Sequence, residues 1–198
     1  MKKGERTKQH IIEKSAELFN RQGYSGSSMN DIIAATGIKK GGLYRHFGSK
    51  EEIALEGFDY AAGIVGSAFT RAVEQEESAS GRLLAFFKVY EDVVHHPPFP
   101  GGCPLQNTAV ECDDTNPELR QRAYRSMTGA LDWMKRIIQE GIHSGEFGRD
   151  VDADSLASFA LSLLEGGIML SKLEGDNRHM RMNTATFSSY LRQFCSRQ

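Results

Sequence analysis

The sequence has little cysteine and no long apolar run. Its 198 residues include three cysteines, which are Cys103, Cys112 and Cys195. Three thiols do not build a disulfide framework, so the composition argues against a secreted, disulfide-stapled domain. No segment approaches a run of about 18 apolar residues, and acidic residues soon cross the basic N-terminus where a signal peptide would have its apolar core. These absences predict a cytoplasmic protein that does not span a membrane.

Strand signals and catalytic motifs are scarce as well. Alternating β-branched runs between turns do not recur. The sequence offers no nucleophile–base pair, no phosphate-binding loop and no zinc-ligand spacing, even where His95 and His96 precede Cys103. We therefore expect no enzyme, no metal and no cofactor. Helical periodicity covers most of the chain instead. It predicts an all-α fold with a first helix that ends at Gly23 and further helices over 29–36, 40–46, 50–77, 80–95, 103–113, 117–144, 153–174 and 178–196.

The charge is unevenly distributed along the chain. The formal net charge is −2, but the first 50 residues hold ten Lys and Arg against four Asp and Glu, and the remainder holds 14 against 22. A basic head on an acidic body suggests that only the head meets a polyanion. We expect a head over 1–50 and a body over 51–198, with the fourth helix joining them.

The stretch 38–50, IKKGGLYRHFGSK, concentrates this positive charge. It follows a short helix that Ser28 can cap and that Gly37 ends. Two short helices joined by a glycine turn, after a supporting helix, are the plan of a helix-turn-helix DNA reader. Lysine and arginine side chains can neutralise phosphates there, and Gly41 and Gly42 let the backbone approach DNA closely.

From Ile11 to about Leu55 the sequence resembles the TetR family of bacterial transcriptional regulators. The matching residues are Ala16 and Phe19 in the first helix, then Gly23-Tyr24, Ile32-Ile33-Ala34, Thr36-Gly37-Ile38, Leu43-Tyr44-Arg45-His46-Phe47 and Ser49-Lys50-Glu51-Glu52. The resemblance implies an N-terminal three-helix DNA-binding domain and a long fourth helix. It also implies a helical body that binds a small-molecule effector and forms a homodimer through its last two helices.

The resemblance assigns contacts with double-stranded operator DNA to residues of the head. Tyr44 and His46 are expected at the DNA backbone, Lys50 at a phosphate, and Lys40 and Arg45 at base edges. The full predicted set is Ser28, Asn30, Lys39, Lys40, Gly42, Tyr44, Arg45, His46 and Lys50.

Two of these positions depart from the family pattern. Lys39 stands where a small hydroxyl residue is usual, and Gly42 stands where Thr or Ser is frequent, so the recognition helix lacks its usual cap. Structural alternatives also remain open. Tyr44 is alternatively a half-buried aromatic of the head, and Ser28 is a helix cap as well as a candidate phosphate ligand.

A second distinctive stretch, PGGCPLQNTAVEC over 100–112, resembles an element of the ligand-binding domain in a subset of the family. Asn107 and Glu111 are four residues apart and therefore share a helix face; they either fix a polar group of the ligand or brace neighbouring helices. Cys103 follows two glycines at a helix start, where backbone amides lower a thiol pKa. It is either an oxidant or electrophile sensor or a small buried hydrophobe. Cys112 lies too far along the helix to pair with Cys103 while that helix is intact.

Apolar stripes in the body give candidates for the effector pocket and for the dimer interface, although such stripes are more often plain core. Glu165, in an otherwise apolar helix, lines the pocket or lies near the dimer axis. The predicted ligand-binding residues are Phe86, Tyr90, Cys103, Asn107, Glu111, Trp133, Ile137, Phe159, Glu165 and Met169. The predicted interface residues are Leu156, Leu163, Gly167, Leu170, Phe187, Tyr190, Leu191 and Phe194.

Together these features predict a ligand-responsive DNA-binding regulator, a repressor that a small effector releases from a near-palindromic operator. One alternative within this class is a thiol-based redox or electrophile sensor that acts through Cys103. The alternative from another class is a helical carrier or enzyme whose head is vestigial.

Overall fold

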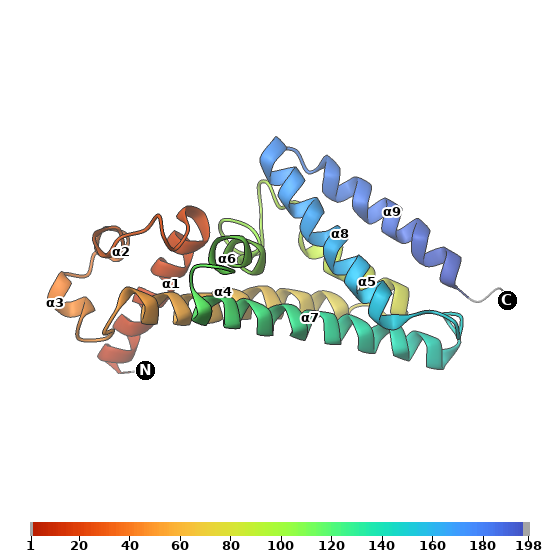
Figure 1. The fold of residues 1–198 in the computed structure, drawn as a ribbon, viewed down its shortest axis with the longest axis horizontal. Coiled ribbons are helices and arrows are strands. Elements are labelled where there is room, and N and C mark those ends of the chain that lie inside the picture. The colour runs from red at the N-terminus through yellow and green to blue at the C-terminus, as the bar shows by residue number, and fades with distance from the viewer. Residues whose placement is uncertain (1, 196–198) are drawn as a thin grey trace. The chain divides into compact units, whose positions relative to one another are not determined.

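The computed structural model describes residues 2–195, and within them it confirms the all-α prediction (Figure 1). No strand is present in this range apart from an isolated bridge between Phe147 and Cys195. The helices are α1 (Lys3–Gln22), α2 (Met29–Thr36), α3 (Lys40–Leu43), α4 (Lys50–Val73), α5 (Ala79–Val89), α6 (Pro104–Cys112), α7 (Pro117–Ser144), α8 (Ala153–Glu174) and α9 (Arg178–Phe194).

Local capping residues set many of these boundaries, and those at Ser28 and Gly37 are the ones predicted above. Ser28 and Asp152 accept hydrogen bonds from backbone amides in the first turns of α2 and α8. Asn116 does the same for α7 through the amide of Leu119, over 3.0 Å. Gly37 ends α2 in the left-handed conformation that glycine adopts without steric cost. The two partners of each contact lie within a few residues of each other in the sequence, which is why the sequence alone reveals these contacts.

Several predicted helices are longer than the observed ones. The predicted helix over 40–46 is α-helical only to Leu43, because Lys39 provides no side-chain cap and two of its residues are glycine. The next residues form a tight turn in which the amide of His46 donates to the carbonyl of Leu43. The fourth and fifth helices end at Val73 and Val89 instead of near 77 and 95. The last helix ends at Phe194, and residue 196 of the predicted range lies outside the described residues.

The chain divides into two compact units. Unit 1 comprises Met1–Val65 and Phe99–Ser126, and unit 2 comprises Gly66–Pro98 and Met127–Gln198. The helices α4 and α7 contribute to both. The predicted boundary at residue 50 does not coincide with this division, because α6 and the start of α7 pack with the N-terminal helices.

Unit 1 has two neighbouring apolar clusters. The first joins α1, α2, α3 and α4 around Ile11, Ile32, Leu43, Phe47 and Ile53, all essentially inaccessible to solvent. The second joins α4, α6 and α7 around Ala54, Phe58, Cys112, Leu119 and Ala123, and Phe19 of α1 packs against both.

Unit 2 is built on α8 and α9, which pack against each other and against α5. Within the described residues, α8 is the only helix long and apolar enough to cross a membrane by length and composition, and 44% of its most apolar window is buried in the protein. Packing of one face against α5 and α9 accounts for part of its apolar character. The apolar side chains on its other face remain exposed.

Candidate nucleic-acid interface

The recognition segment is fixed from beneath by two buried side chains. Leu43 and Phe47 are at most 1% exposed and pack with Ile11 and Ile32 in the core of the head. Because these two anchors point inward, the side chains between and before them on α3 and its following turn point outward. The short helix therefore has a defined orientation although it lacks a cap.

The predicted DNA contacts on this segment are accessible. Lys39, Lys40 and Arg45 are exposed, and Tyr44 is 47% exposed, so its ring is accessible and its contact with DNA stays a prediction. The ammonium of Lys40 lies 6.0 Å from the centre of the Tyr44 ring, within range of a cation–π contact. Gly42 and His46 are half-buried.

The start of α2 forms a reciprocal cap. The amide of Asp31 donates to the Ser28 hydroxyl over 3.2 Å, while the Ser28 amide and hydroxyl donate to the Asp31 carboxylate over 2.7 and 2.6 Å. The hydroxyl and then the amide of Ser28 lower the pKa of Asp31. Ser28 is therefore a helix cap, and contact with phosphate remains a prediction. Asn30 is exposed on the same helix.

Lys50 has an intramolecular role that the sequence did not reveal. Its ammonium donates to the carbonyls of Tyr24 and Ser27 over 2.8 and 3.0 Å and lies 4.0 Å from the centre of the Tyr24 ring. It thus closes the turn between α1 and α2. Its predicted role as a phosphate ligand has no support in this geometry and stays a prediction.

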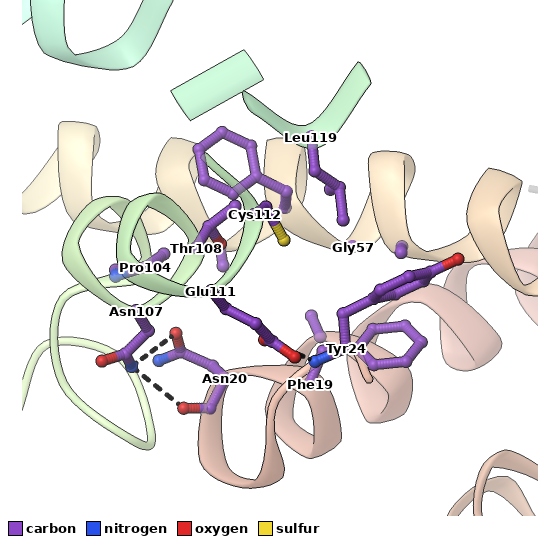
Figure 2. A pocket seen from close by; sticks show the side chains of 14 residues that line it. Phe19, Asn20, Tyr24, Gly57, Pro104, Asn107, Thr108, Glu111, Cys112 and Leu119 are labelled. Atoms are coloured by element: carbon purple, nitrogen blue, oxygen red, sulfur yellow. Dashed lines mark hydrogen bonds between the residues drawn. The ribbon is translucent and has the colours of Figure 1, made fainter. Parts of the chain in front are cut away.

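Asn107 and Glu111 of α6 bind the end of α1 (Figure 2). The carboxylate of Glu111 accepts the amides of Tyr24 and Ser25 over 2.8 and 2.6 Å. The side-chain amide of Asn107 donates to the backbone carbonyl and the side-chain oxygen of Asn20, each over 3.0 Å. Of the two roles that the sequence left open, the structure displays the bracing one.

Beside these contacts lies a small cavity of about 30 Å³, lined by residues of α1, α4, α6 and α7 that include Phe19, Gly57, Pro104 and Cys112 (Figure 2). This space accommodates roughly one water molecule. Burial, followed by the charges of Glu111 and Asp113, raises the pKa of Cys112 to about 11. That thiol is therefore protonated and unreactive at neutral pH. Cys103 is also buried, with 4% of its surface exposed.

Part of the predicted effector pocket forms an aromatic cluster in unit 2. The rings of Phe86 and Trp133 lie 5.0 Å apart, and Tyr90 and Ile137 are fully buried. Phe69 of α4 belongs to this cluster, 4.9 Å from Phe86 and 5.9 Å from Tyr90. Phe69 is absent from the set of pocket residues that the sequence predicts.

Two of the predicted pocket residues have a different environment. Phe159 packs against Phe187 and Tyr190 of α9, at ring distances of 6.2 and 5.0 Å, and is partly exposed. Met169 is 52% exposed. Neither residue lines the aromatic cluster, because Phe159 lies against α9 and Met169 is exposed to solvent. Glu165 is half-buried, and Cys103, Asn107 and Glu111 belong to unit 1.

The residues of the predicted dimer interface differ in their exposure, and the interface stays a prediction. Four of its members, Leu156, Gly167, Phe187 and Leu191, are already buried within the chain and have no surface to offer a partner. Gly167, for example, allows α9 to approach so closely that a Cβ atom there would lie 2.8 Å from the sulfur of Met180. Leu163, Tyr190 and Phe194 are half-buried and Leu170 is exposed. The exposed apolar side chains of α8 and α9 are Phe159, Met169, Leu170, Leu173 and Met182.

Comparison with known protein families gives two adjacent matches. Residues 11–56 match the family model described as bacterial regulatory proteins, tetR family. Residues 79–187 match the model described as tetracyclin repressor-like, C-terminal domain.

Individual proteins are similar over nearly the whole chain. A TetR transcriptional regulator of known structure from Chloroflexus aurantiacus is 38% identical, with a TM-score of 0.94 and 98% of each chain covered. A TetR-family regulator from Cytophaga hutchinsonii is 31% identical, with a TM-score of 0.93, 100% of this chain and 99% of that chain covered. The HTH-type transcriptional repressor DhaR of Mycobacterium sp. (strain GP1) is 29% identical, with 84% of this chain and 83% of DhaR covered.

Proposed function

Because the chain belongs to the TetR family and is a helix-turn-helix transcriptional regulator, we propose that it is a homodimeric repressor that a small effector releases from a near-palindromic operator. A two-fold dimer presents two heads, and a matching pair of half-sites about one helical turn apart follows from that symmetry.

The observation that carries this proposal is the exposed face of the recognition segment. Lys40, Tyr44 and Arg45 project from a segment whose other face, Leu43 and Phe47, is buried in the head. Such an arrangement presents cationic and hydrogen-bonding groups to a major groove in a fixed orientation. We assign Lys40 and Arg45 to base edges and phosphates and Tyr44 to the DNA backbone.

We assign effector binding to the neighbourhood of the aromatic cluster in unit 2. Phe69, Phe86, Tyr90 and Trp133 present apolar ring faces with one phenol hydroxyl and one indole N–H among them. That chemistry suits a small, largely apolar molecule with few polar groups. Such an effector releases the DNA only if it has a higher affinity for the protein state that does not bind DNA than for the state that does.

A thiol-sensing role has less support. Cys103 is buried, and the thiol of Cys112 is held protonated by its surroundings. We expect a Cys103→Ser variant to keep the effector response of the parent. Loss of that response would restore the thiol-based alternative.

The test is duplex binding by fluorescence anisotropy, with an operator obtained by random-site selection. We expect tight binding that falls steeply with salt and that weakens at least about tenfold in Tyr44→Ala. Tyr124→Ala, which alters an exposed tyrosine on α7, is the matched control and should bind like the parent. A folded parent that selects no duplex at low salt would contradict the proposed function.

A further inference from the structure

The turn between α1 and α2 is held by a carboxylate from α6. Helix α1 ends at Gln22, and the amides of Tyr24 and Ser25 follow the capping residue Gly23. Both amides donate to Glu111, one to each carboxylate oxygen, over 2.8 and 2.6 Å. Figure 2 shows the contact with Tyr24. Charge-assisted hydrogen bonds of this length are about twice as strong as neutral ones.

The backbone is shaped to admit this carboxylate. Gly23 has φ of +81°, and a Cβ atom at that position would lie 2.9 Å from a carboxylate oxygen of Glu111. A side chain at residue 23 would therefore force the Glu111 carboxylate to shift from this position. The short distance to Glu111 depends on the absence of that side chain.

A second contact between α1 and the α6 region is built in the same way. Asn20 donates to the carbonyls of Pro100 and Gly102 over 2.8 and 3.1 Å, and it accepts the amide of Asn107. Gly101, with φ of +96°, leaves room here, since its Cβ atom would lie 2.5 Å from the carbonyl oxygen of Asn20. Two side chains of one α6 face thus bind the last turn of α1 and the turn that follows it.

The turn that Glu111 holds leads directly into the DNA-reading motif. Its far end is Ser27, whose hydroxyl donates to the carbonyl of Gly23 over 2.7 Å. The next residue, Ser28, caps α2. A displacement of α6 that carries Glu111 with it must therefore either move this turn or break the two hydrogen bonds.

We propose that Glu111 is a positioning residue for DNA binding, and that α6 sets operator affinity by holding the α1–α2 turn through Glu111 and the last turn of α1 through Asn107. The residue touches no DNA in this role. It acts through the backbone of Tyr24 and Ser25, which orients α2 and the ends of the recognition motif. This inference rests on the proposed function, because it describes how DNA binding is controlled.

The experiment compares the full-length parent with Glu111→Gln and Glu111→Ala. Gln keeps the size of the side chain but offers one acceptor where the carboxylate offers two. The neighbouring variant Val110→Ala is the matched control, since Val110 is 79% exposed on the same helix. Three quantities are measured for each: operator affinity over a range of salt, hydrogen exchange of the head amides, and unfolding of unit 2 followed by the fluorescence of Trp133.

Both Glu111 variants should bind the operator about tenfold more weakly or worse, the loss expected for charge-assisted hydrogen bonds. Their salt dependence should equal that of the parent, because no phosphate contact is removed. The amides of Tyr24 and Ser25 should exchange about tenfold faster, while the unfolding of unit 2 stays at the parental midpoint. Val110→Ala should match the parent in all three measurements.

Parental affinity in both Glu111 variants would overturn the inference. A loss of operator affinity with unchanged hydrogen exchange of the Tyr24 and Ser25 amides would also overturn it. The same holds for a loss of affinity together with a lower unfolding midpoint of unit 2, because that result would indicate general destabilisation. These results are distinct from a failure of the proposed function, in which the parent itself binds no duplex.

Discussion

The carboxylate of Glu111 and the ammonium of Lys50 bind the same peptide segment at Tyr24. The Tyr24 amide donates to Glu111 over 2.8 Å, and its carbonyl accepts a hydrogen bond from Lys50, also over 2.8 Å. Opposite charges from α6 and from the start of α4 therefore fix the turn that precedes α2. Loss of either side chain should therefore change the structure of the head, although neither side chain contacts DNA in this role.

Lys50→Ala tests whether this lysine is a phosphate ligand. We expect weaker operator binding, because the turn loses two hydrogen bonds to the Lys50 ammonium. The slope of the logarithm of affinity against the logarithm of salt concentration should stay parental. Lys40→Ala, in contrast, should reduce the slope by about 0.9, the value for one phosphate contact. Equal reductions in both variants would restore Lys50 as a phosphate ligand.

Gly23→Ala should be among the most damaging single substitutions in the head. The positive φ alone costs about 1–3 kcal/mol for a residue with a side chain, and the added Cβ atom clashes with Glu111. Gly175→Ala provides the comparison, because Gly175 has φ of +75° and ψ of 19°, a left-handed conformation that side chains tolerate better than the ψ of 159° at Gly23, and it has no neighbouring atom within 4 Å. Circular dichroism during thermal unfolding, together with hydrogen exchange of the head, should show the larger effect for Gly23→Ala. Equal effects would mean that neither the backbone conformation particular to Gly23 nor the close approach of Glu111 adds a cost.

Glu146 gives a pH-dependent prediction for unit 2. Burial raises the pKa of this carboxyl, but hydrogen bonds from the Ser80 hydroxyl and from the amides of Ser80 and Ala79 outweigh it, so the net pKa lies below the ordinary 4.5. A carboxyl whose pKa is lower in the folded than in the unfolded state stabilises the folded protein at pH values above the unfolded-state pKa. This stabilisation is lost as the pH falls through the folded-state pKa. Glu146→Gln should therefore lower stability at about pH 7 by about 1–2 kcal/mol.

The difference between parent and Glu146→Gln should shrink as the pH falls from the ordinary value of 4.5 through the lower folded-state pKa, where the parental carboxyl also becomes protonated. This difference in stability is measured by denaturant unfolding at several pH values, with Trp133 fluorescence as the signal. A difference that is independent of pH would show that the charge of Glu146 adds nothing to its hydrogen bonds with Ala79 and Ser80 at the start of α5.

Leu170→Glu tests the apolar surface of α8 as the dimer contact. Leu170 is exposed together with Met169 and Leu173, and a carboxylate buried in an apolar interface without a partner is costly. We expect the dimer to dissociate at least about tenfold more readily, as measured by sedimentation velocity over a concentration series. Tyr124→Glu, at an exposed site on α7, should leave the association unchanged. Parental association of Leu170→Glu would place the interface elsewhere.

Local signals made much of this fold predictable. Ser28, Asn116 and Asp152 cap helices through atoms only two or three residues away, and Gly37 ends α2 through its own backbone conformation. The buried positions Leu43 and Phe47 also follow from helical spacing and apolar character. Helix ends without a strong stop signal, such as those of α4 and α5, were misplaced because several endings fit the sequence equally well.

The sequence by itself determined the helical class, the helix-turn-helix motif and its basic surface, because these depend on composition and on residues close together in the chain. Only the tertiary structure decided what the polar side chains of α6 and α4 bind. Glu111 reaches amides 86 and 87 positions away. Lys50 reaches carbonyls 26 and 23 positions away. As residue types, Glu and Lys can bind a ligand, a phosphate or a backbone turn equally well. Which of these they bind depends on the groups that the packing of α1, α4 and α6 brings within hydrogen-bonding distance.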